Sequence, residues 1–450
     1  MRFLPHTDDD IRAMLDDVGV PEVADLFNDV PQELRARAAL NLAPGLSEQE
    51  VRARLEQLAA RNTAAPRHCF LGAGTYPHFG PAVVDHVLQR AEFYSAYTPY
   101  QPEVSQGTLQ AIFEFQTLVA MLLGMEVANA SMYDGASATA EAVLMALRIH
   151  PKRSRVVLSR ALHPQYREVV RTYATVAGGD GAHHADLVEA PFASNGRTDI
   201  DWLANRVNDE TAAVVVGYPN FFGVVEDLDA IGTLAHAHGA LLITATAEAT
   251  ALGLLKSPGA CGADIAVAEG QSLGVPMSYG GPGVGLFATR SDFVRMMPGR
   301  LVGEAVDGGG RRGYVLTLAT REQHIRREKA TSNICTNHGL IALAVTVYLS
   351  TVGKIGLREL AIANTAAAHR AMERLTTAGK WQQQFSAPFF NEFVLAGVNA
   401  EAVWEAASAR GVLAGVPLRR WYPELRETLM LCVTEAHDAT AVDALMAALR

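Results

Sequence analysis

Short, continuous apolar runs alternate with segments of helical periodicity between residues 156 and 288. The runs end at glycine or at charged residues, which is typical of buried strands. Because their apolar positions are continuous rather than alternating, they indicate a mostly parallel sheet with helices on both faces. The predicted strands are 156–158, 213–216, 240–243, 265–267 and 284–288, and the helices between them include 165–176 and 228–238.

The two ends of the chain have other patterns. Thr7 and Ser47 are N-cap signals for helices in a segment with too little apolar surface to fold alone. Beyond residue 330, helical periodicity over 340–349 and 357–375 gives way to strand-like runs at 389–395 and 428–433 and a last helix at 439–449. We therefore predict a helical arm (1–65), a large α/β domain (66–330) and a small α+β domain (331–450).

Charge and composition exclude several functions. The net charge of −10 argues against a nucleic-acid partner, whose phosphates would repel the chain. We find no apolar run near the roughly 20 residues that span a bilayer, and the N-terminus is acidic where a signal peptide is apolar. The four cysteines are far apart and lack metal-ligand spacing, so no metal site is expected. These features predict a cytoplasmic protein that does not enter a membrane.

The stretch 263–283 carries the first chemical signal. A buried strand ends there in Gln271 and Ser272, and a glycine- and proline-rich turn follows. In enzymes that use pyridoxal phosphate, such a step carries the lysine that forms the Schiff base with the cofactor. An amide cannot form an imine, so Gln271 predicts a scaffold without its covalent anchor. The whole chain has only five lysines, which are Lys152, Lys256, Lys329, Lys354 and Lys380.

Residues from three further segments could belong to a cofactor pocket. Asp134, Gly135 and Ser137 open a helix whose N-terminus would suit a phosphate, although an ordinary capped helix explains them equally. Asn220 follows a strand and could face a ring substituent or make a simple turn. Glu248 could pair with a pyridinium nitrogen, but a surface glutamate at a helix start is the favoured interpretation.

Two loops have unusual composition. Residues 93–103 contain three tyrosines together with two prolines that stiffen the backbone. Residues 320–333 concentrate positive charge within an acidic protein, and arginines there could bind a carboxylate or phosphate. By composition alone, a solvated and salt-bridged helix start explains the second loop better.

Four segments together resemble glycine decarboxylase, the P-protein of the glycine cleavage system. The resemblance is closer to subunit 1 of the enzymes that are divided between two chains. It rests on AYTPYQPEVSQG at 96–107, VPMSYGGP at 275–282, MPGR at 297–300 and TREQHIRREK at 320–329. Length and order match over essentially the whole chain.

The resemblance implies a fold-type-I transferase-like large domain and a partner, subunit 2, that binds pyridoxal phosphate covalently. It implies a heterotetramer with two chains of each kind. The implied reaction decarboxylates glycine on the cofactor and passes the aminomethyl group to the lipoyl arm of the H-protein. Because the segment 244–250 lacks the aspartate common in this fold, this chain is expected to bind no cofactor itself.

By the same analogy, this chain lends residues to a site shared with subunit 2. The candidates are Tyr97, Thr98, Tyr100, Gln101, Glu103, Arg321, His324, Arg326, Thr331 and Asn333. A vestigial cofactor pocket would hold Asp134, Gly135, Ser137, Asn220, Glu248 and Gln271. The alternatives are a self-sufficient pyridoxal-phosphate lyase or aminotransferase anchored by Lys256 or Lys329, and a purely structural or regulatory module.

Overall fold

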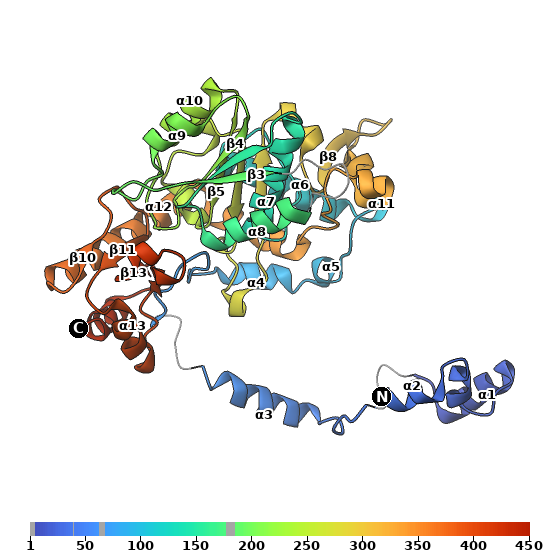
Figure 1. The fold of residues 1–450 in the computed structure, drawn as a ribbon. Coiled ribbons are helices and arrows are strands. Elements are labelled where there is room, and N and C mark those ends of the chain that lie inside the picture. Colours follow the sequence, from blue (N-terminus) through green and yellow to red (C-terminus); the bar gives the residue numbers. More distant parts are fainter. Residues whose placement is uncertain (1–4, 39, 63–67, 177–184) are drawn as a thin grey trace. The chain divides into compact units, whose positions relative to one another are not determined.

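The computed structural model describes residues 5–38, 40–62, 68–176 and 185–450. The chain separates into two compact units, Met1–Thr63 and Ala64–Arg450 (Figure 1). The first unit contains α1 (Asp8–Val18), α2 (Gln32–Arg37) and α3 (Glu48–Ala59). Thr7 and Ser47 cap α1 and α3 with complete capping boxes, as their sequence predicts.

A seven-stranded sheet organises the second unit, with strand order β1-β7-β6-β5-β4-β2-β3. The five strands from β6 to β3 are parallel; at one edge β7 pairs antiparallel with β6, and β1 pairs antiparallel with β7. The strands are β1 (Val127–Ala128), β2 (Arg155–Ser159), β3 (Asp186–Ala190), β4 (Thr211–Gly217), β5 (Leu241–Thr246), β6 (Ile265–Glu269) and β7 (Gly285–Thr289). The expected mostly parallel sheet is therefore present.

Helices cover both faces of this sheet (Figure 1). Alternate residues of a strand enter different cores: Val214 packs with α6, α10 and α12, whereas Val215 packs with α7 and α8. Both faces are apolar for this reason, which explains the continuous apolar runs of the sequence. The helices are α4 (Ala82–Leu88), α5 (Ala91–Tyr94), α6 (Gln106–Leu123), α7 (Gly135–Ile149), α8 (Pro164–Val176), α9 (Ile200–Arg206), α10 (Leu228–Ala237), α11 (Gln323–Arg326) and α12 (Gly339–Thr377).

A second, antiparallel sheet follows in the last part of the chain, with strand order β10-β11-β13-β12. Helices α13 (Ala400–Ala409) and α14 (Ala439–Ala448) pack on it and bury a separate apolar core. Phe70, which lies far away in sequence, belongs to the same core. The strands are β10 (Gln382–Gln383), β11 (Glu392–Ala396), β12 (Val416–Pro417) and β13 (Thr428–Cys432).

Some elements differ from the sequence-based expectation. Strand β3 lies at the edge of the large sheet and is partly polar, so it has no continuous apolar run. The hairpin of β8 (Leu301–Val306) and β9 (Arg312–Thr317) was not predicted either. The two helices predicted at 340–349 and 357–375 are confirmed: they form the two parts of α12, which are separated at Gly353, where the backbone is not helical (φ 60°, ψ −177°).

Helix α12 corrects one statement based on the sequence. By length and composition alone it is apolar enough to cross a membrane, so the chain does contain such a segment. Its residues Ala342, Ala344, Val345 and Tyr348 are buried in the core beneath the large sheet. The core helices of water-exposed domains pass the same test, so α12 is weak evidence for a membrane span.

Gly223 lies too close to the backbone of β11 to be replaced by a larger residue. Its φ is +78°, and a Cβ at this position would lie 2.0 Å from the backbone oxygen of Glu392. Gly223→Ala should therefore lower the free energy of unfolding by more than ~2 kcal/mol in chemical denaturation. Gly379→Ala is the control, because it has a similar φ of +84° with no atom within 4 Å, and should cost only ~1 kcal/mol. Equal losses in the two variants would contradict the close contact.

Candidate functional site

The carboxyl ends of the parallel strands meet in a crevice, where ligands bind in open α/β sheets. Residues after β2, β4 and β5 line it, together with two residues from outside the large sheet, Tyr76 and Glu392. The remaining cavity is about 10 Å³, which is scarcely room for one water molecule. Protein side chains and backbone therefore fill the crevice.

Gln271 lies directly after β6 at this end of the sheet and is 6% exposed. Its side-chain oxygen accepts the amide hydrogen of Tyr76 at 2.9 Å. Its side-chain nitrogen donates to the carbonyl oxygens of Tyr76 at 3.1 Å and Val275 at 2.7 Å. Both ends of the amide are thus used, and Gln271 pairs with Tyr76 much as one strand pairs with another.

The N-terminus of α7 is occupied by a carboxylate of the protein. The Glu269 side chain accepts the amide hydrogens of Gly135 at 2.9 Å, Val284 at 2.9 Å and Gln271 at 3.0 Å. Burial raises the pKa of Glu269 to about 7, although the three amide donors act in the opposite direction. An anion at a helix N-terminus is favourable, and here the chain supplies it itself.

The other residues predicted for this pocket have partners within the chain. The Asp134 side chain caps α7 by accepting from the Ser137 amide at 2.7 Å. The Asn220 side chain donates to Gly196 and Glu226 and accepts from the backbone amides of its own turn. Glu248 is 2% exposed, so the expectation of a surface glutamate is wrong. The sequence favoured that expectation because no neighbour of Glu248 signals a buried partner.

His78 is that partner. Its ring lies between Glu248 and Glu435, with nitrogen–oxygen distances of 2.9 Å to each carboxylate. Burial alone would lower the pKa of His78, but the two carboxylates outweigh it and raise the pKa to about 10. A protonated imidazole therefore joins the large sheet region to the loop after β13.

A second cluster forms around Arg300, which is 6% exposed. Its guanidinium donates to Thr98 at 3.2 Å, to Thr336 at 3.1 Å and to the Tyr100 hydroxyl at 3.1 Å. It lies 5.5 Å from the centre of the Tyr100 ring and 3.5 Å from the Glu322 carboxylate. Arg300 thus brings together the two unusual loops of the sequence.

Sequence reasoning missed Arg300 as a site residue, although the MPGR motif at 297–300 contains it. Of the predicted residues, the cluster includes Thr98, Tyr100 and His324, whose ring packs edge-on against Tyr100 at 5.7 Å. In the sequence, Arg300 is a lone arginine between a glycine and an apolar strand. This local pattern does not show that its side chain contacts Thr98, Tyr100, Thr336 and Glu322.

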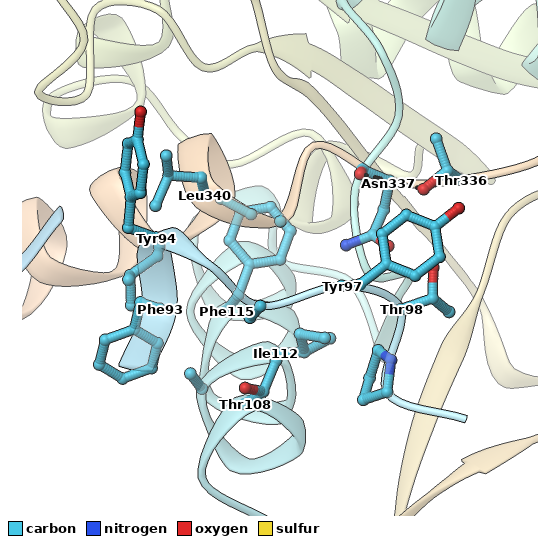
Figure 2. Close-up of a pocket in the computed structure, with 16 residues that line it drawn as sticks. Phe93, Tyr94, Tyr97, Thr98, Thr108, Ile112, Phe115, Thr336, Asn337 and Leu340 are labelled. Atoms are coloured by element: carbon cyan, nitrogen blue, oxygen red, sulfur yellow. Dashed lines mark hydrogen bonds between the residues drawn. The ribbon is translucent and has the colours of Figure 1, made fainter. Parts of the chain in front are cut away.

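A pocket of about 240 Å³ opens beside this cluster. Figure 2 shows Tyr97 and Thr98 near Thr336 and Asn337, with Tyr94 farther along the wall. Its floor is apolar and comes from α6 and the start of α12. Tyr97 is 86% exposed, and so large an exposed aromatic side chain next to a pocket is typical of a binding surface.

The remaining predicted residues lie apart from this pocket. Arg321 donates to the carbonyl oxygens of Met297 and Gly299 and so supports the loop before Arg300. Thr331 and Asn333 line a separate open pocket of about 870 Å³ beside α7 and α8. Three candidates are exposed and line neither pocket: Gln101, Glu103 and Arg326.

The crevice does not fit pyridoxal phosphate as these residues stand. A cavity of about 10 Å³ cannot take an aromatic ring with its phosphate, and the α7 amide that would meet an anion already binds Glu269. None of the residues that line the crevice is a lysine. Lys256, one of the alternative anchors, is exposed and pairs with Asp229 at 3.0 Å, and Lys329 is exposed as well.

The fold nevertheless defines a class. It matches a solved sphingosine-1-phosphate lyase from Burkholderia pseudomallei at 18% identity, with a TM-score of 0.67 and 91% and 92% of the two chains covered. At that identity the match shows the fold alone. The chain has the architecture of the fold-type-I pyridoxal-phosphate enzymes, as the family resemblance implies.

Closer comparisons identify the family. The sequence model of the family described as glycine cleavage system P-protein matches residues 1–449. A probable glycine dehydrogenase (decarboxylating) subunit 1 from Anaeromyxobacter dehalogenans (strain 2CP-C) is 54% identical over 100% of both chains. One of the same description from Carboxydothermus hydrogenoformans is 49% identical over 99% of this chain and 98% of its own. A solved inhibitor-bound glycine decarboxylase (P-protein) is 45% identical, with a TM-score of 0.91 and 100% and 99% of the two chains covered. The chain belongs to the P-protein family of the glycine cleavage system, among its subunit 1 chains.

Arg300→Lys tests the cluster. A lysine has three donors on one atom and cannot reach four partners, so the loop 97–104 should loosen. We expect a loss of ~1–3 kcal/mol in unfolding free energy and faster proteolytic cleavage within the loop. Arg312→Lys is the matched control, because Arg312 is exposed and its nearest carboxylate, Glu304, is 3.7 Å away. A variant at position 300 as stable and resistant as the control would refute this role of Arg300.

His78→Gln tests the buried ion triad. Since the pKa of His78 is raised to about 10 from 6.5, its contribution is full below pH 6.5 and is lost as the pH rises through 10. Within that window the imidazole should give the unfolding free energy a slope of roughly −1.4 kcal/mol per pH unit. The difference between wild type and variant, measured by denaturation from pH 6 to 10, should therefore shrink as the pH rises. A constant difference would show that His78 is neutral.

Proposed function

We propose that this chain is the subunit of glycine decarboxylase that carries no cofactor lysine and completes the active site of subunit 2. Together the two chains would decarboxylate glycine on pyridoxal phosphate, held covalently by subunit 2, and pass the aminomethyl group to the lipoyl arm of the H-protein. The cofactor supplies the electron sink for decarboxylation. We place the complex, two chains of each kind, in the cytoplasm.

One observation carries this proposal: the crevice of this chain is filled at the position where its class binds the cofactor. Gln271 follows β6, where we expect the anchoring lysine, and its amide is bonded to Tyr76 and Val275. The relatives named subunit 1 support a second chain, because a subunit 1 implies a subunit 2. The catalytic chemistry would then take place in the partner, and this chain would contribute from its surface.

The cluster around Arg300 is the surface best suited to that task. Tyr97 and Tyr100 are 86% and 51% exposed, yet the loop that carries them is fixed to Arg300 through Thr98 and Tyr100. A rigid loop presents hydroxyl groups to a shared site at little entropic cost. Large aromatic rings also exclude water from such a site, which strengthens its electrostatic interactions. We expect Tyr97, Gln101 and Glu103 to face subunit 2.

The test is glycine-dependent release of CO₂ from this chain, from subunit 2, and from the two mixed, with H-protein present. We expect activity only in the mixture. Tyr97→Phe removes one hydroxyl, and kcat/KM of the mixture should fall about tenfold, the effect of losing roughly one hydrogen bond at the reacting site. Tyr94→Phe is the comparison, because Tyr94 is similarly exposed, at 72%, and lies farther along the wall of the same pocket, so a smaller loss there would show that the tenfold effect belongs to the Tyr97 hydroxyl.

The contradicting results are specific. Activity of this chain alone would favour the self-sufficient enzyme. Activity of the mixture that is unchanged by Tyr97→Phe and by Glu103→Gln, with assembly intact, would leave this chain a structural role only.

A further inference from the structure

We infer that residues 70–79 are a built-in plug: they occupy the crevice in place of a cofactor and fasten the four-stranded sheet to the seven-stranded sheet. This inference deepens the proposed function and rests on the same filled crevice, but it concerns residues of this chain alone, so its test does not require subunit 2. It starts from the disagreement between the class of fold and the filled crevice.

The plug enters the crevice through its backbone. The carbonyl oxygen of Ala73 lies 2.9 Å from His163 Nε2, and the Tyr76 backbone forms its paired bonds with Gln271. Since His163 Nδ1 accepts from the Gln165 amide, Nε2 carries the hydrogen that is donated to Ala73. Burial lowers the pKa of His163 to about 4, so the ring is neutral in this contact.

Two glycines allow this close approach. Gly74 has a φ of +97°, and a Cβ there would lie 3.2 Å from His163 Nε2. Gly72 has a φ of +61°, and its Cβ would lie 2.5 Å from both the Glu392 carboxylate and Cys432. By composition alone, this glycine-rich segment would fit a plain turn. The structure shows a segment whose glycines permit tight contact on two sides.

The other side of the plug is bonded to the four-stranded sheet and the loop after it. Glu392 of β11 accepts from the Ala73 amide at 2.7 Å and from the Tyr76 hydroxyl at 3.0 Å. Thr434 donates to the Pro77 carbonyl oxygen at 2.6 Å. His78 then bridges Glu248, just after β5, to Glu435, just after β13. Every one of these partners is buried or nearly so, which makes the bonds costly to break.

Glu269 completes the replacement. Its carboxylate meets the Gly135 amide at the N-terminus of α7, the kind of position that holds a phosphate in nucleotide and cofactor sites. Thus the plug fills the volume of the crevice, and the Glu269 carboxylate occupies the N-terminus of α7. A crevice between two sheets is also where enzymes close by hinge motion, and a plug bonded to both sides prevents that motion.

Hydrogen exchange on the full-length chain tests the plug directly. The amides of Ala73 and Tyr76 should exchange at least ~100-fold more slowly than in an unstructured peptide, and adding pyridoxal phosphate should leave both rates unchanged. Gln271→Leu removes the acceptor for the Tyr76 amide and should speed its exchange about tenfold. Gln110→Leu, on the exposed face of α6, is the matched control and should change neither rate.

A covalent test complements this measurement. Gln271→Lys provides an amine, but borohydride should fix no pyridoxal phosphate at position 271, because the plug leaves no room. Fast exchange in wild type, slowing by the cofactor, or fixation at position 271 would each overturn the inference. Failure of the proposed function would appear instead as inactivity of the mixed subunits, so the two failures are distinguishable.

Discussion

The ion triad of His78 with Glu248 and Glu435 is the interaction on which the second unit depends. The His78 imidazolium lies between the buried Glu248 carboxylate and the Glu435 carboxylate, whose side chain is 16% exposed, so loss of His78 would leave both carboxylates without their cation. The triad therefore fixes the position of residues 70–79. That segment in turn fixes Gln271 and Glu392, and so determines that the crevice at the strand ends is closed.

The closed crevice and the fixed surface loops are consistent with one role, because both make this chain rigid. A chain whose own pocket is filled does not need flexibility there. Rigidity benefits a subunit that must hold loops in place for another chain. Arg300 has the corresponding role at the surface, since one buried guanidinium fixes the loop containing Thr98 and Tyr100 against Thr336. Both devices rely on a buried cationic side chain shared by segments that are distant in sequence.

The sequence predicts the large sheet well because β4, β5 and β6 are buried on both faces and so are continuously apolar. It does not predict β3, a partly polar edge strand, or the burial of Glu248. A single carboxylate has no local mark of being buried; its partner His78 lies 170 residues away. Gln271 was a useful exception, because an amide after such a strand is chemically unable to do what a lysine does there. The division into three domains and the ten residues proposed for the shared site remain predictions.

The central claim is that the two chains divide the work, with the cofactor in one and a completed surface in the other. The most direct test is borohydride reduction of the reconstituted complex, followed by peptide mapping of the pyridoxylated lysine. The account predicts label in subunit 2 alone, with one cofactor for each pair of chains. Label on any of the five lysines of this chain would contradict it.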